Sequence, residues 1–393
     1  MSLLTPDGRA LLDRLAGEDA GPDRALELAR SLRGRYPPGL VAEALTQQTL
    51  RAAARAKFSR AEQMLFTRPG LEQASSEIMA SHTAARYPAA ALVADLCCGI
   101  GGNLTALGRG RCVIAVDFDF ASLEYARHNA GVYAAAGNLA AVCADVADIE
   151  LGGVDAVFVD PARRSGGRRL GAGRSEPPLD WCLGLARRVP AVGIKAAPGL
   201  PRELVPAGWE AEFVAVGRDL KEALLWSPAL ATAPSRATVL PSGDTLTAQP
   251  GVRGADVPVA EPGAFLLDPS PAVTRAGLVA ELARRLGAWK IDHQIAFLSA
   301  GRELTSPFAR TLRVLESAPW HERQFARKLR DLGIGAADIR RRGLAGDVPQ
   351  IHRRLALRGP GRATVVITRV SGRPWGLICA DIAGPSNDPD AAT

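Results

Sequence analysis

The chain has 393 residues, 47% hydrophobic and 23% charged, which is typical of a protein that folds in water and is longer than one hydrophobic core usually serves. No apolar run is long enough to span a bilayer and the start lacks the pattern of a secretory signal, so we expect a cytoplasmic protein. The net charge of +7 arises in the C-terminal part, because residues 301–381 hold 16 Lys and Arg against 7 Asp and Glu. This concentration favours a polyanionic partner, unless it merely reflects an Arg-rich composition.

The first 85 residues are predicted to be helical. Apolar residues recur at helical spacing in residues 25–32, 40–50 and 52–64, and a Pro-Pro-Gly run at 37–39 separates the first two helices. An Arg-Pro-Gly run at 68–70 is expected to break one helix before another starts.

From residue 89 the pattern changes to repeats of strand, loop and helix, which favour a parallel sheet with both faces covered. Strands are expected at residues 93–96, 112–116, 140–143, 156–159 and 192–195, and helices at 123–133 and 179–188. Apolar runs without intervening helices are expected to form an antiparallel edge of the same sheet, at residues 212–216, 223–226 and 238–240.

The remainder is predicted to be a linker at 247–262, an amphipathic helix at 275–286 and a compact α/β module. The module has predicted strands at 312–315, 338–341, 364–370 and 377–379, and helices at 322–332 and 349–355. The expected domains are a helical segment (1–85), an α/β domain (86–248), a linker with a helix (249–306), a basic α/β domain (307–384) and a disordered tail (385–393).

A glycine loop follows the first predicted strand. Residues 93–103 read VADLCCGIGGN, an apolar run that ends in Asp95 and continues into Gly99, Gly101 and Gly102. Glycines let a backbone turn sharply and approach a ligand closely. A strand that ends in such a loop and feeds a helix is the opening turn of a nucleotide site in a doubly wound α/β fold.

Acidic residues end four successive predicted strands: Asp95, Asp117, Asp145 and Asp160. In an open α/β sheet the ligand lies outside the carboxyl ends of the strands, so we expect all four carboxyl groups at one crevice.

Two cofactors compete for this crevice. A dinucleotide site requires a third glycine, where Leu104 stands, and Asp95 would face the pyrophosphate. S-adenosylmethionine has a sulfonium and an ammonium but no phosphate, so an acidic lining favours it. Asp117, 16 residues after Gly101, is positioned for the ribose hydroxyls, and Asp145 for the adenine amino group.

The turn Asp160-Pro161-Ala162-Arg163 indicates the reaction class. The Asp160 carboxylate and the Pro161 carbonyl can both accept hydrogen bonds from an exocyclic amine, which aims the nitrogen lone pair at a methyl donor. Arg163 can hold a base edge or a phosphate. The alternative is an ordinary strand-ending turn. We therefore assign Asp160, Pro161 and Arg163 as candidate catalytic residues.

The chain resembles the bacterial class I S-adenosylmethionine-dependent methyltransferases with a THUMP-like C-terminal domain, and its core is similar to RNA guanine-N2 methyltransferases of the trimethylguanosine-synthase type. The motifs are DLCCGIGGN at 95–103, AVDFD at 115–119, CADVADI at 143–149, VDPARR at 159–164 and FTRPGLEQASS at 66–76. The resemblance implies a Rossmann-like sheet with an N-terminal helical segment and a small C-terminal α/β THUMP-like domain.

The resemblance also implies which residues bind the cofactor. They are Asp95, Cys97, Gly99, Gly101 and Asn103 in the loop, Asp117 with Phe118, Asp145 with Val146, and Phe66 with Thr67 before the core. For Phe66, packing in the core is the alternative. Uracil-C5 RNA methyltransferases share the DPAR turn but need a cysteine after the fifth strand, where this chain reads VGIKAAPGL. Lys195 in that run either contacts substrate or extends to solvent.

The predicted substrate-binding residues of the basic module are Arg323, Arg327, Arg340, Arg341 and Arg353, with Trp320 and Trp375 available to stack on bases. A solvated basic face with both tryptophans in the core is the alternative. The sequence thus predicts an S-adenosylmethionine-dependent methyltransferase that modifies a nitrogen of a base in tRNA or rRNA. An RNA-binding module that retains the cofactor without turnover, or a methyltransferase for protein or small molecules, are the other hypotheses.

Overall fold

The computed structural model describes residues 2–18, 22–32, 34–162, 164–165, 168–169, 175–249 and 257–382. It divides into two compact units, Met1–Trp209 with Leu224–Ala231, and Glu210–Ala223 with Thr232–Thr393. Arg163 and the tail 385–393, both of which carry sequence predictions, lie outside the described residues. Among the described residues, no helix combines the length and the apolar character needed to cross a bilayer.

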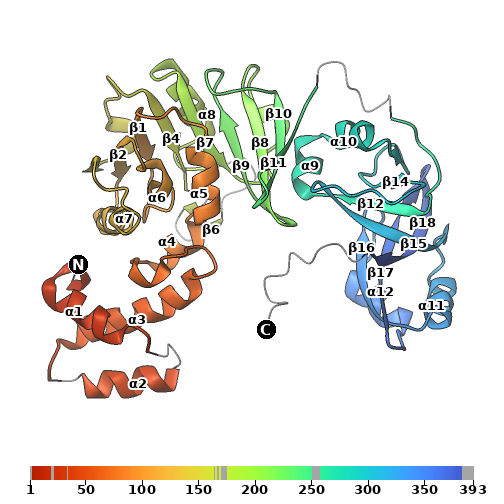
Figure 1. Cartoon of the computed structure of the whole chain (residues 1–393), viewed down its shortest axis with the longest axis horizontal. Helices are drawn as coiled ribbons and strands as arrows, with labels where there is room; N and C mark the ends of the chain where they lie inside the picture. Colours follow the sequence, from red (N-terminus) through yellow and green to blue (C-terminus); the bar gives the residue numbers. More distant parts are fainter. Residues whose placement is uncertain are drawn as a thin grey trace. The chain divides into compact units, whose positions relative to one another are not determined.

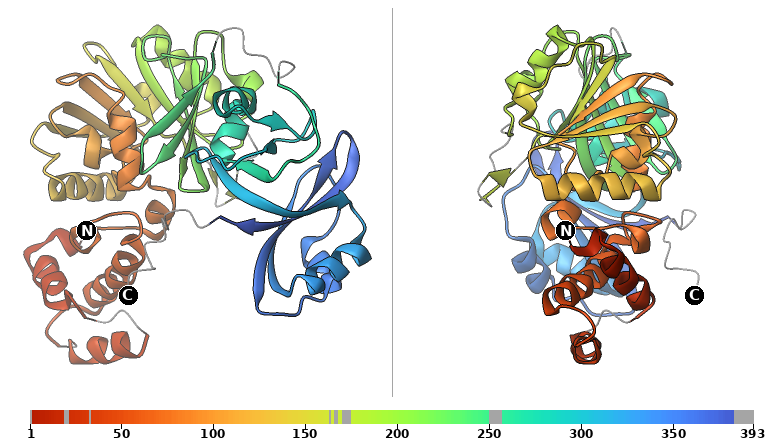
Figure 2. Two further views of the ribbon diagram at one scale, coloured as in Figure 1. Left: turned by 45° about the vertical axis from the view of Figure 1, so that its right-hand side comes forward. Right: turned by 90° about the vertical axis from the view of Figure 1, so that its left-hand side faces the viewer.

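The first unit begins with helices that share a core of leucine and alanine side chains beside the sheet (Figures 1 and 2). They are η1 (Ser2–Leu4), α1 (Pro6–Leu15), α2 (Pro22–Ser31) and α3 (Pro38–Ala54). The last three each start with a proline, whose fixed φ suits the first turn and whose missing N–H is not needed there.

Three short elements follow α3: η2 (Ala61–Gln63), α4 (Arg68–Gln73) and α5 (Glu77–Ala84). The predicted helix at 52–64 is wrong beyond Ala54, where α3 ends. In the turn that follows, Lys57 Nζ donates to the backbone carbonyls of residues 71 and 74. The Arg-Pro-Gly run starts α4 instead of breaking a helix. Thr67 caps this helix through its hydroxyl, and Pro69 lies in the first turn.

The large sheet has nine strands, and those around the glycine loop pair in parallel, as predicted (Figure 1). In spatial order the strands are β11 (Asp244–Thr247), β10 (Ser235–Leu240), β8 (Glu210–Val216), β9 (Asp219–Trp226), β7 (Ala191–Ala196), β4 (Ala156–Val159), β1 (Leu92–Leu96), β2 (Cys112–Asp117) and β3 (Leu139–Cys143). The connecting elements are α6 (Leu104–Leu107), α7 (Phe120–Val132), η3 (Val146–Asp148), the hairpin β5 (Arg164–Ser165) and β6 (Arg168–Arg169), α8 (Leu179–Gly184), η4 (Leu185–Arg187) and η5 (Arg202–Leu204).

The edge beyond β7 follows the predicted antiparallel arrangement in part. β8 and β9 are neighbours joined by residues 217 and 218, so they run antiparallel, but β10 pairs with β8 in parallel and with β11 antiparallel. The chain leaves β9 and returns through residues 227–234 to the opposite side of β8, so β10 runs in the same direction as β8. Alternating apolar residues identify strands but do not encode such a return.

The second sheet has seven strands and includes residues that the sequence assigned to a linker. Its order is β13 (Trp289–Lys290), β14 (Leu298–Ala300), β12 (Phe265–Pro269), β15 (Ala309–Pro319), β18 (Arg373–Asp381), β17 (Gly361–Val370) and β16 (Ile334–Arg341). The expected helix at 275–286 is two helices, α9 (Pro271–Ala276) and α10 (Val279–Leu286), because Gly277 adopts a left-handed conformation that ends α9.

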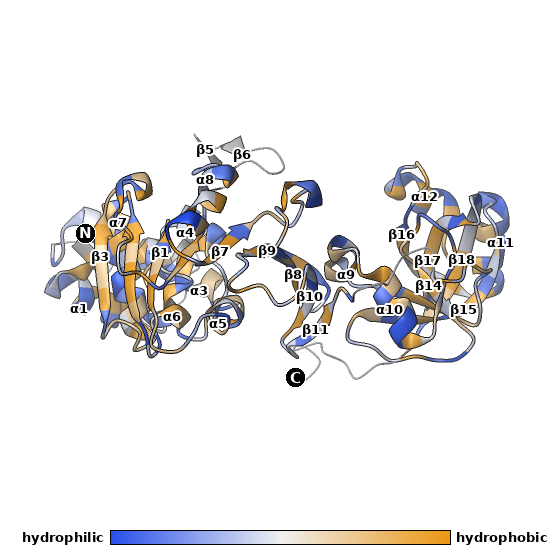
Figure 3. Ribbon diagram, turned by 90° about the horizontal axis from the view of Figure 1, so that it is seen from above, coloured by the Kyte–Doolittle hydropathy of each residue, from blue (hydrophilic) through white to orange (hydrophobic). Residues whose placement is uncertain are grey.

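Helices α11 (Glu322–Asp331) and α12 (Val348–Leu355) cover one face of this sheet with Phe325, Leu329 and Leu355. Residues 291–297 cover the other face, where Phe297 packs against Leu312. The hydropathy colouring in Figure 3 shows largely hydrophobic strands, whereas α11 carries hydrophilic stretches. The module therefore has a continuous core, and its helices present charged residues outward.

Candidate active site

The carboxyl ends of β1, β2 and β4 lie side by side. Asp95 on β1 is in register with Phe158 on β4, and the Asp160 amide donates to the carbonyl of Leu96 at 3.1 Å. The pKa of Asp95 is raised by burial first and then by the charges of Asp160 and Asp117. Asp117 and Asp160 therefore lie near enough to Asp95 to raise its pKa.

Asp95 is fully buried, and neither of its carboxyl oxygens accepts a hydrogen bond from a described residue. Its pKa lies well above the usual range because burial penalises the charged form. The residue Asn103 is five per cent exposed, and its Oδ1 also accepts no hydrogen bond from a described residue. Buried acceptors without donors are costly in a folded protein, so this pair indicates a place for a ligand that donates hydrogen bonds.

The loop between β1 and α6 has an unusual backbone. Cys97, a non-glycine residue, has a φ of 60°, and Gly101 has a φ of 81°. A Cβ on Gly101 would lie 2.9 Å from the Cα of Ala126, so α7 can pack here only against glycine. A Cβ on Gly99 would meet nothing within 4 Å, which leaves the backbone of that residue bare toward open space.

The thiol of Cys97 is not a candidate nucleophile. Its pKa is raised well above the usual range by burial and by the nearby carboxylates of Asp117 and Asp160. A protonated thiol is a weak nucleophile. Chemistry that begins with attack by a thiolate is therefore disfavoured at this site.

Asp117 is buried and ties the loop to β2. Its Oδ2 accepts from the Gly99 amide at 2.8 Å and its Oδ1 from the Asp119 amide at 3.0 Å. Burial raises its pKa. The next side chain, Phe118, is 81% exposed, an unusual position for a large aromatic ring and one that suits contact with a flat ligand.

Asp145 lies at the start of η3, where its Oδ1 accepts from the Ala147 amide at 2.9 Å. Its side chain is exposed, and Val146 beside it is buried. The predicted adenine-binding pair is thus present at the end of β3.

The segment before the core packs directly on the glycine loop. A Cβ on Gly70 would lie 2.5 Å from Ile100, and Thr67 is half-buried at the start of α4. Phe66, by contrast, is only 1% exposed and packs on Phe58 with ring centroids 5.9 Å apart. The structure therefore places the Phe66 ring in the core, where it is not available to a cofactor.

Sequence reasoning missed Asn129, which joins this segment to the loop. Its Nδ2 donates to the carbonyls of Leu65 and Ile100, and its Oδ1 accepts from the Leu65 amide. The sequence feature that could have identified Asn129 is its position as an amide residue on the apolar face of α7, beside Ala126 and Ala130. A fully buried polar residue on such a face requires partners, and these partners fix the loop.

Asp160 and Lys195 form an ion pair at the ends of β4 and β7. Lys195 Nζ lies 2.7 Å from Asp160 Oδ2 and donates to the Gln73 carbonyl at 3.3 Å. The Lys195 side chain is only 3% exposed and that of Asp160 is 21% exposed. Pro161 is buried, and Ala162 pairs with Glu176 through two backbone hydrogen bonds. Only the carboxylate of this ion pair is open to a substrate.

Comparisons with known proteins agree with this geometry. Residues 90–167 match a family model described as RNA cap guanine-N2 methyltransferase, residues 309–381 one described as THUMP domain-like, and residues 1–54 a domain of unknown function (DUF8688). An uncharacterized S-adenosylmethionine-dependent methyltransferase of Mycobacterium tuberculosis (strain CDC 1551 / Oshkosh) is 39% identical over 338 residues, 82% of this chain and 90% of that protein. The chain belongs to the S-adenosylmethionine-dependent methyltransferases.

An uncharacterized S-adenosylmethionine-dependent methyltransferase of M. tuberculosis strain H37Rv matches this chain with the same identity and coverage. A solved structure from Porphyromonas gingivalis W83, provisionally named a methyltransferase, has a TM-score of 0.77 at 22% identity. It covers 96% of this chain and 99% of its own, and it shows that the fold is shared.

The acidic crevice of this methyltransferase fits its cofactor. S-adenosylmethionine has an ammonium and a sulfonium, so it offers both donors and positive charge. The unsatisfied carboxyl oxygens of Asp95 and the unsatisfied Asn103 Oδ1 are acceptors in need of such donors. The raised pKa of Asp95 means that a cation nearby would favour the charged form of this carboxyl group.

The predicted substrate-binding arginines lie in the THUMP-like domain of the methyltransferase and differ in their contacts. Arg323, Arg327 and Arg353 are exposed and form no ion pair with any described residue. Arg340 is paired with Asp338 at 2.9 Å, and Arg341 donates to the carbonyl of Leu344. The first three are therefore free to bind an anion, whereas Arg340 is partly compensated.

The two tryptophans of this domain have partners within it. Trp320 packs on Phe325 with ring centroids 4.9 Å apart, and Trp375 donates from its indole nitrogen to Ser317 Oγ. Both rings are partly buried and pack against the hydrophobic clusters of the domain.

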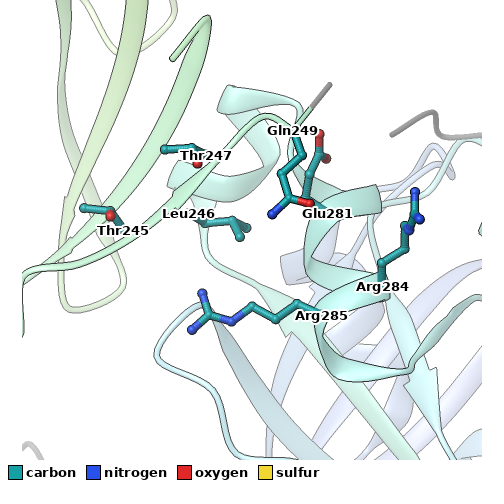
Figure 4. Close-up of a pocket in the computed structure, with 7 residues that line it drawn as sticks. All are labelled: Thr245, Leu246, Thr247, Gln249, Glu281, Arg284 and Arg285. Carbon is teal, nitrogen blue, oxygen red and sulfur yellow. The ribbon is translucent and has the colours of Figure 1, made fainter. Parts of the chain in front are cut away.

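A separate cavity of about 420 Å³ lies between β11 and α10 (Figure 4). Its lining contains none of the residues predicted from the sequence. The lining residues are Thr245, Leu246, Thr247, Gln249, Glu281, Arg284 and Arg285.

We predict that Asp95→Asn changes how the stability of the cofactor-free methyltransferase depends on pH. The folded-state pKa of Asp95 is raised, so the folded chain keeps this proton at pH values where the unfolded chain, with a pKa of about 4, has lost it. The contribution of Asp95 to wild-type stability therefore falls as the pH rises above about 4, and the variant lacks this contribution. We expect the melting temperature of the variant to exceed that of the wild type at pH 8 by about 2–4 °C per kcal/mol gained.

Differential scanning calorimetry from pH 4 to pH 8 measures this difference. Asp148→Asn is the matched control, because Asp148 is exposed and its substitution should leave the pH dependence as in the wild type. Parallel curves for wild type and Asp95→Asn across the range would contradict the prediction.

Proposed function

We propose that this methyltransferase transfers a methyl group to a nitrogen of a base in RNA, either tRNA or rRNA. The observation that carries the proposal is the Asp160-Pro161 turn, which presents a partly exposed carboxylate beside the acidic crevice. The turn holds two acceptors, the Asp160 carboxylate and the Pro161 carbonyl, and an exocyclic amine has two N–H donors to match them. The match to the guanine-N2 family model over residues 90–167 supports a base nitrogen as acceptor.

The crevice residues have separate parts in this proposal. Asp95 and Asn103 hold the ammonium end of the cofactor, and Asp117 holds the ribose. Asp145 and Val146 hold the adenine. The bare backbone at Gly99, the turn at Gly101, and Cys97, Phe118 and Thr67 enclose it.

The bound cofactor supplies a methyl group that is already electrophilic, because it is attached to a sulfonium. Asp160 and Pro161 accept the amine N–H groups and direct the nitrogen lone pair at the methyl carbon. The cofactor held in the crevice would supply the methyl group and keep the electron pair of the broken carbon–sulfur bond, and Asp160 would pass the amine proton lost on methylation to solvent. Orientation of this kind accounts for up to about 7–11 kcal/mol of a barrier, so no strong base is needed.

The basic arginines of the THUMP-like domain support RNA as the partner. Arg323, Arg327 and Arg353 are exposed and uncompensated among the described residues, and planar guanidinium groups suit phosphates. We propose four domains. They are the helical segment (1–85), the methyltransferase domain (86–248), the connection (249–306) and the THUMP-like domain (307–384), and strands β12–β14 of the connection join the last sheet.

We also propose a cytoplasmic location, which the free thiols of all six cysteines support.

Transfer of tritiated methyl groups to total RNA tests the proposal. RNA from a strain that lacks the gene should accept label, RNA from the parent should not, and mass spectrometry of nucleosides should show one methylated base missing in the deletion strain. Label in protein or in small molecules but not in RNA would overturn the RNA proposal. Cofactor binding without transfer to any fraction would indicate the RNA-binding module without turnover.

A further inference from the structure

Lys195 is placed by the sheet next to the proposed acceptor carboxylate. Val159 on β4 is in register with Ile194 on β7, so the next residues, Asp160 just beyond β4 and Lys195 within β7, lie side by side. The Lys195 ammonium lies 2.7 Å from Asp160 Oδ2 and also donates to the carbonyl of Gln73, the last residue of α4. Three elements of the first unit thus meet at one ammonium group.

The burial of Lys195 argues against a direct role in substrate binding. Its side chain is 3% exposed, whereas the carboxylate that it contacts is 21% exposed. A substrate that reaches Asp160 does not reach the ammonium behind it. Burying a charge is costly and a buried ion pair is weak evidence for stability, since apolar residues of similar volume often serve as well.

We infer that Lys195 is a positioning residue with two effects on Asp160. It holds Oδ2, so that Oδ1 faces the acceptor. Its positive charge also balances the negative charge of the carboxylate, so that the site takes an uncharged nitrogen. Among the described residues, none is shown to donate to Asp160 Oδ1. The inference rests on the proposed function, in which Asp160 accepts from the acceptor amine.

The positive charge of Lys195 beside Asp160 distinguishes uncharged amines from positively charged ones. An exocyclic amine of a base is uncharged in neutral solution, whereas a lysine side chain or an N-terminal amine of a protein arrives largely as a cation. A second cation at the same carboxylate would be opposed by the ammonium of Lys195, because like charges close together disfavour each other. The ion pair therefore favours a base over a protein amine as acceptor.

Lys195→Met tests the inference, because methionine fills similar space without charge. We expect the turnover number with RNA to fall about 100-fold, as for a misplaced catalytic group, while the cofactor dissociation constant from calorimetry changes less than about threefold. Lys195→Arg should recover part of the turnover. In Lys195→Ala, added alkylammonium ions, from methylammonium to butylammonium, should restore part of the turnover. A purely structural role of Lys195 does not give such a rescue.

Lys221→Ala is the matched control. This strand lysine is exposed and paired with Asp219 on β9, and its loss should leave turnover unchanged. Unchanged turnover in Lys195→Met, or a loss of turnover that neither arginine nor any alkylammonium ion relieves, would overturn the inference.

Crystal structures of the variants separate this inference from the proposed function. The Asp160 carboxylate should turn away from its wild-type position in Lys195→Met and Lys195→Ala and keep it in Lys221→Ala. An Asp160 that stays in place in both Lys195 variants would overturn the positioning role even if RNA is the substrate. If the wild type transfers no methyl group to RNA, the proposed function fails, and the position of Asp160 still tests the role of Lys195.

Discussion

Asp160→Ala is expected to lower methyl transfer about 100- to 10,000-fold while cofactor affinity stays within about tenfold, or 1.4 kcal/mol. In the proposed function, the carboxylate at the end of β4 accepts from the acceptor amine, whereas Asp95 and Asn103, whose buried oxygens are unsatisfied, hold the cofactor. Single-turnover rates with labelled cofactor and calorimetric binding measure the two quantities separately. Equal losses in both would contradict the role assigned to Asp160.

The ion pair between Asp160 and Lys195 adds a loss of stability to the loss of turnover in Asp160→Ala, and a second substitution can separate the two effects. Removing Asp160 leaves the buried ammonium of Lys195 without its carboxylate, and breaking a buried pair costs about 3–5 kcal/mol. Asp160→Ala should therefore melt at a lower temperature than the wild type. The double variant Asp160→Ala with Lys195→Met should regain stability without regaining turnover, which separates the structural cost from the catalytic loss.

The sequence predicted the central sheet because its information there is local. Four of the five predicted parallel strands have an acidic residue at or just beyond their carboxyl end, and parallel pairing brings these ends to one edge. Asp117 and Asp160 raise the pKa of Asp95 for this reason. The bare backbone at Gly99 follows equally from the residue type.

The parts that the sequence could not predict depend on long-range pairing. Nothing in residues 265–300 shows that β12 and β14 join the sheet of the THUMP-like domain, because the runs are short and lie between turns. The direction of β10 relative to β8 is likewise set by the path of the chain after β9.

The side-chain pairings have the same origin. Lys195 was predicted either to contact substrate or to extend to solvent, and the structure instead buries it against Asp160. That contact requires the strand order β1-β4-β7, which places the ends of β4 and β7 together. The sequence left Phe66 either near the cofactor or in the core, and the structure places its ring in the core, where Gln47 holds the backbone of that residue with two hydrogen bonds.

A triple variant of the THUMP-like domain, Arg323→Gln with Arg327→Gln and Arg353→Gln, is expected to weaken RNA binding about 100-fold at physiological salt. The three side chains are exposed and uncompensated among the described residues, and α11 and α12, which carry them, are linked by the pairing of Arg354 with Glu322. Removal of each arginine that binds a phosphate should make the slope of log K against log salt shallower by about one. Filter binding of cellular RNA over a range of salt concentrations measures both effects.

Point substitutions serve better here than deletion of residues 301–393, because a cut at that position removes β15 to β18 from a sheet that also contains β12, β13 and β14. The matched control is Arg9→Gln with Arg14→Gln and Arg30→Gln, which removes the same charge from exposed positions on α1 and α2. If net charge alone attracted RNA, both triple variants would weaken binding equally. A loss confined to the first triple variant, with cofactor binding intact, would assign RNA binding to the α11–α12 surface and leave the acidic crevice to the methyl transfer itself.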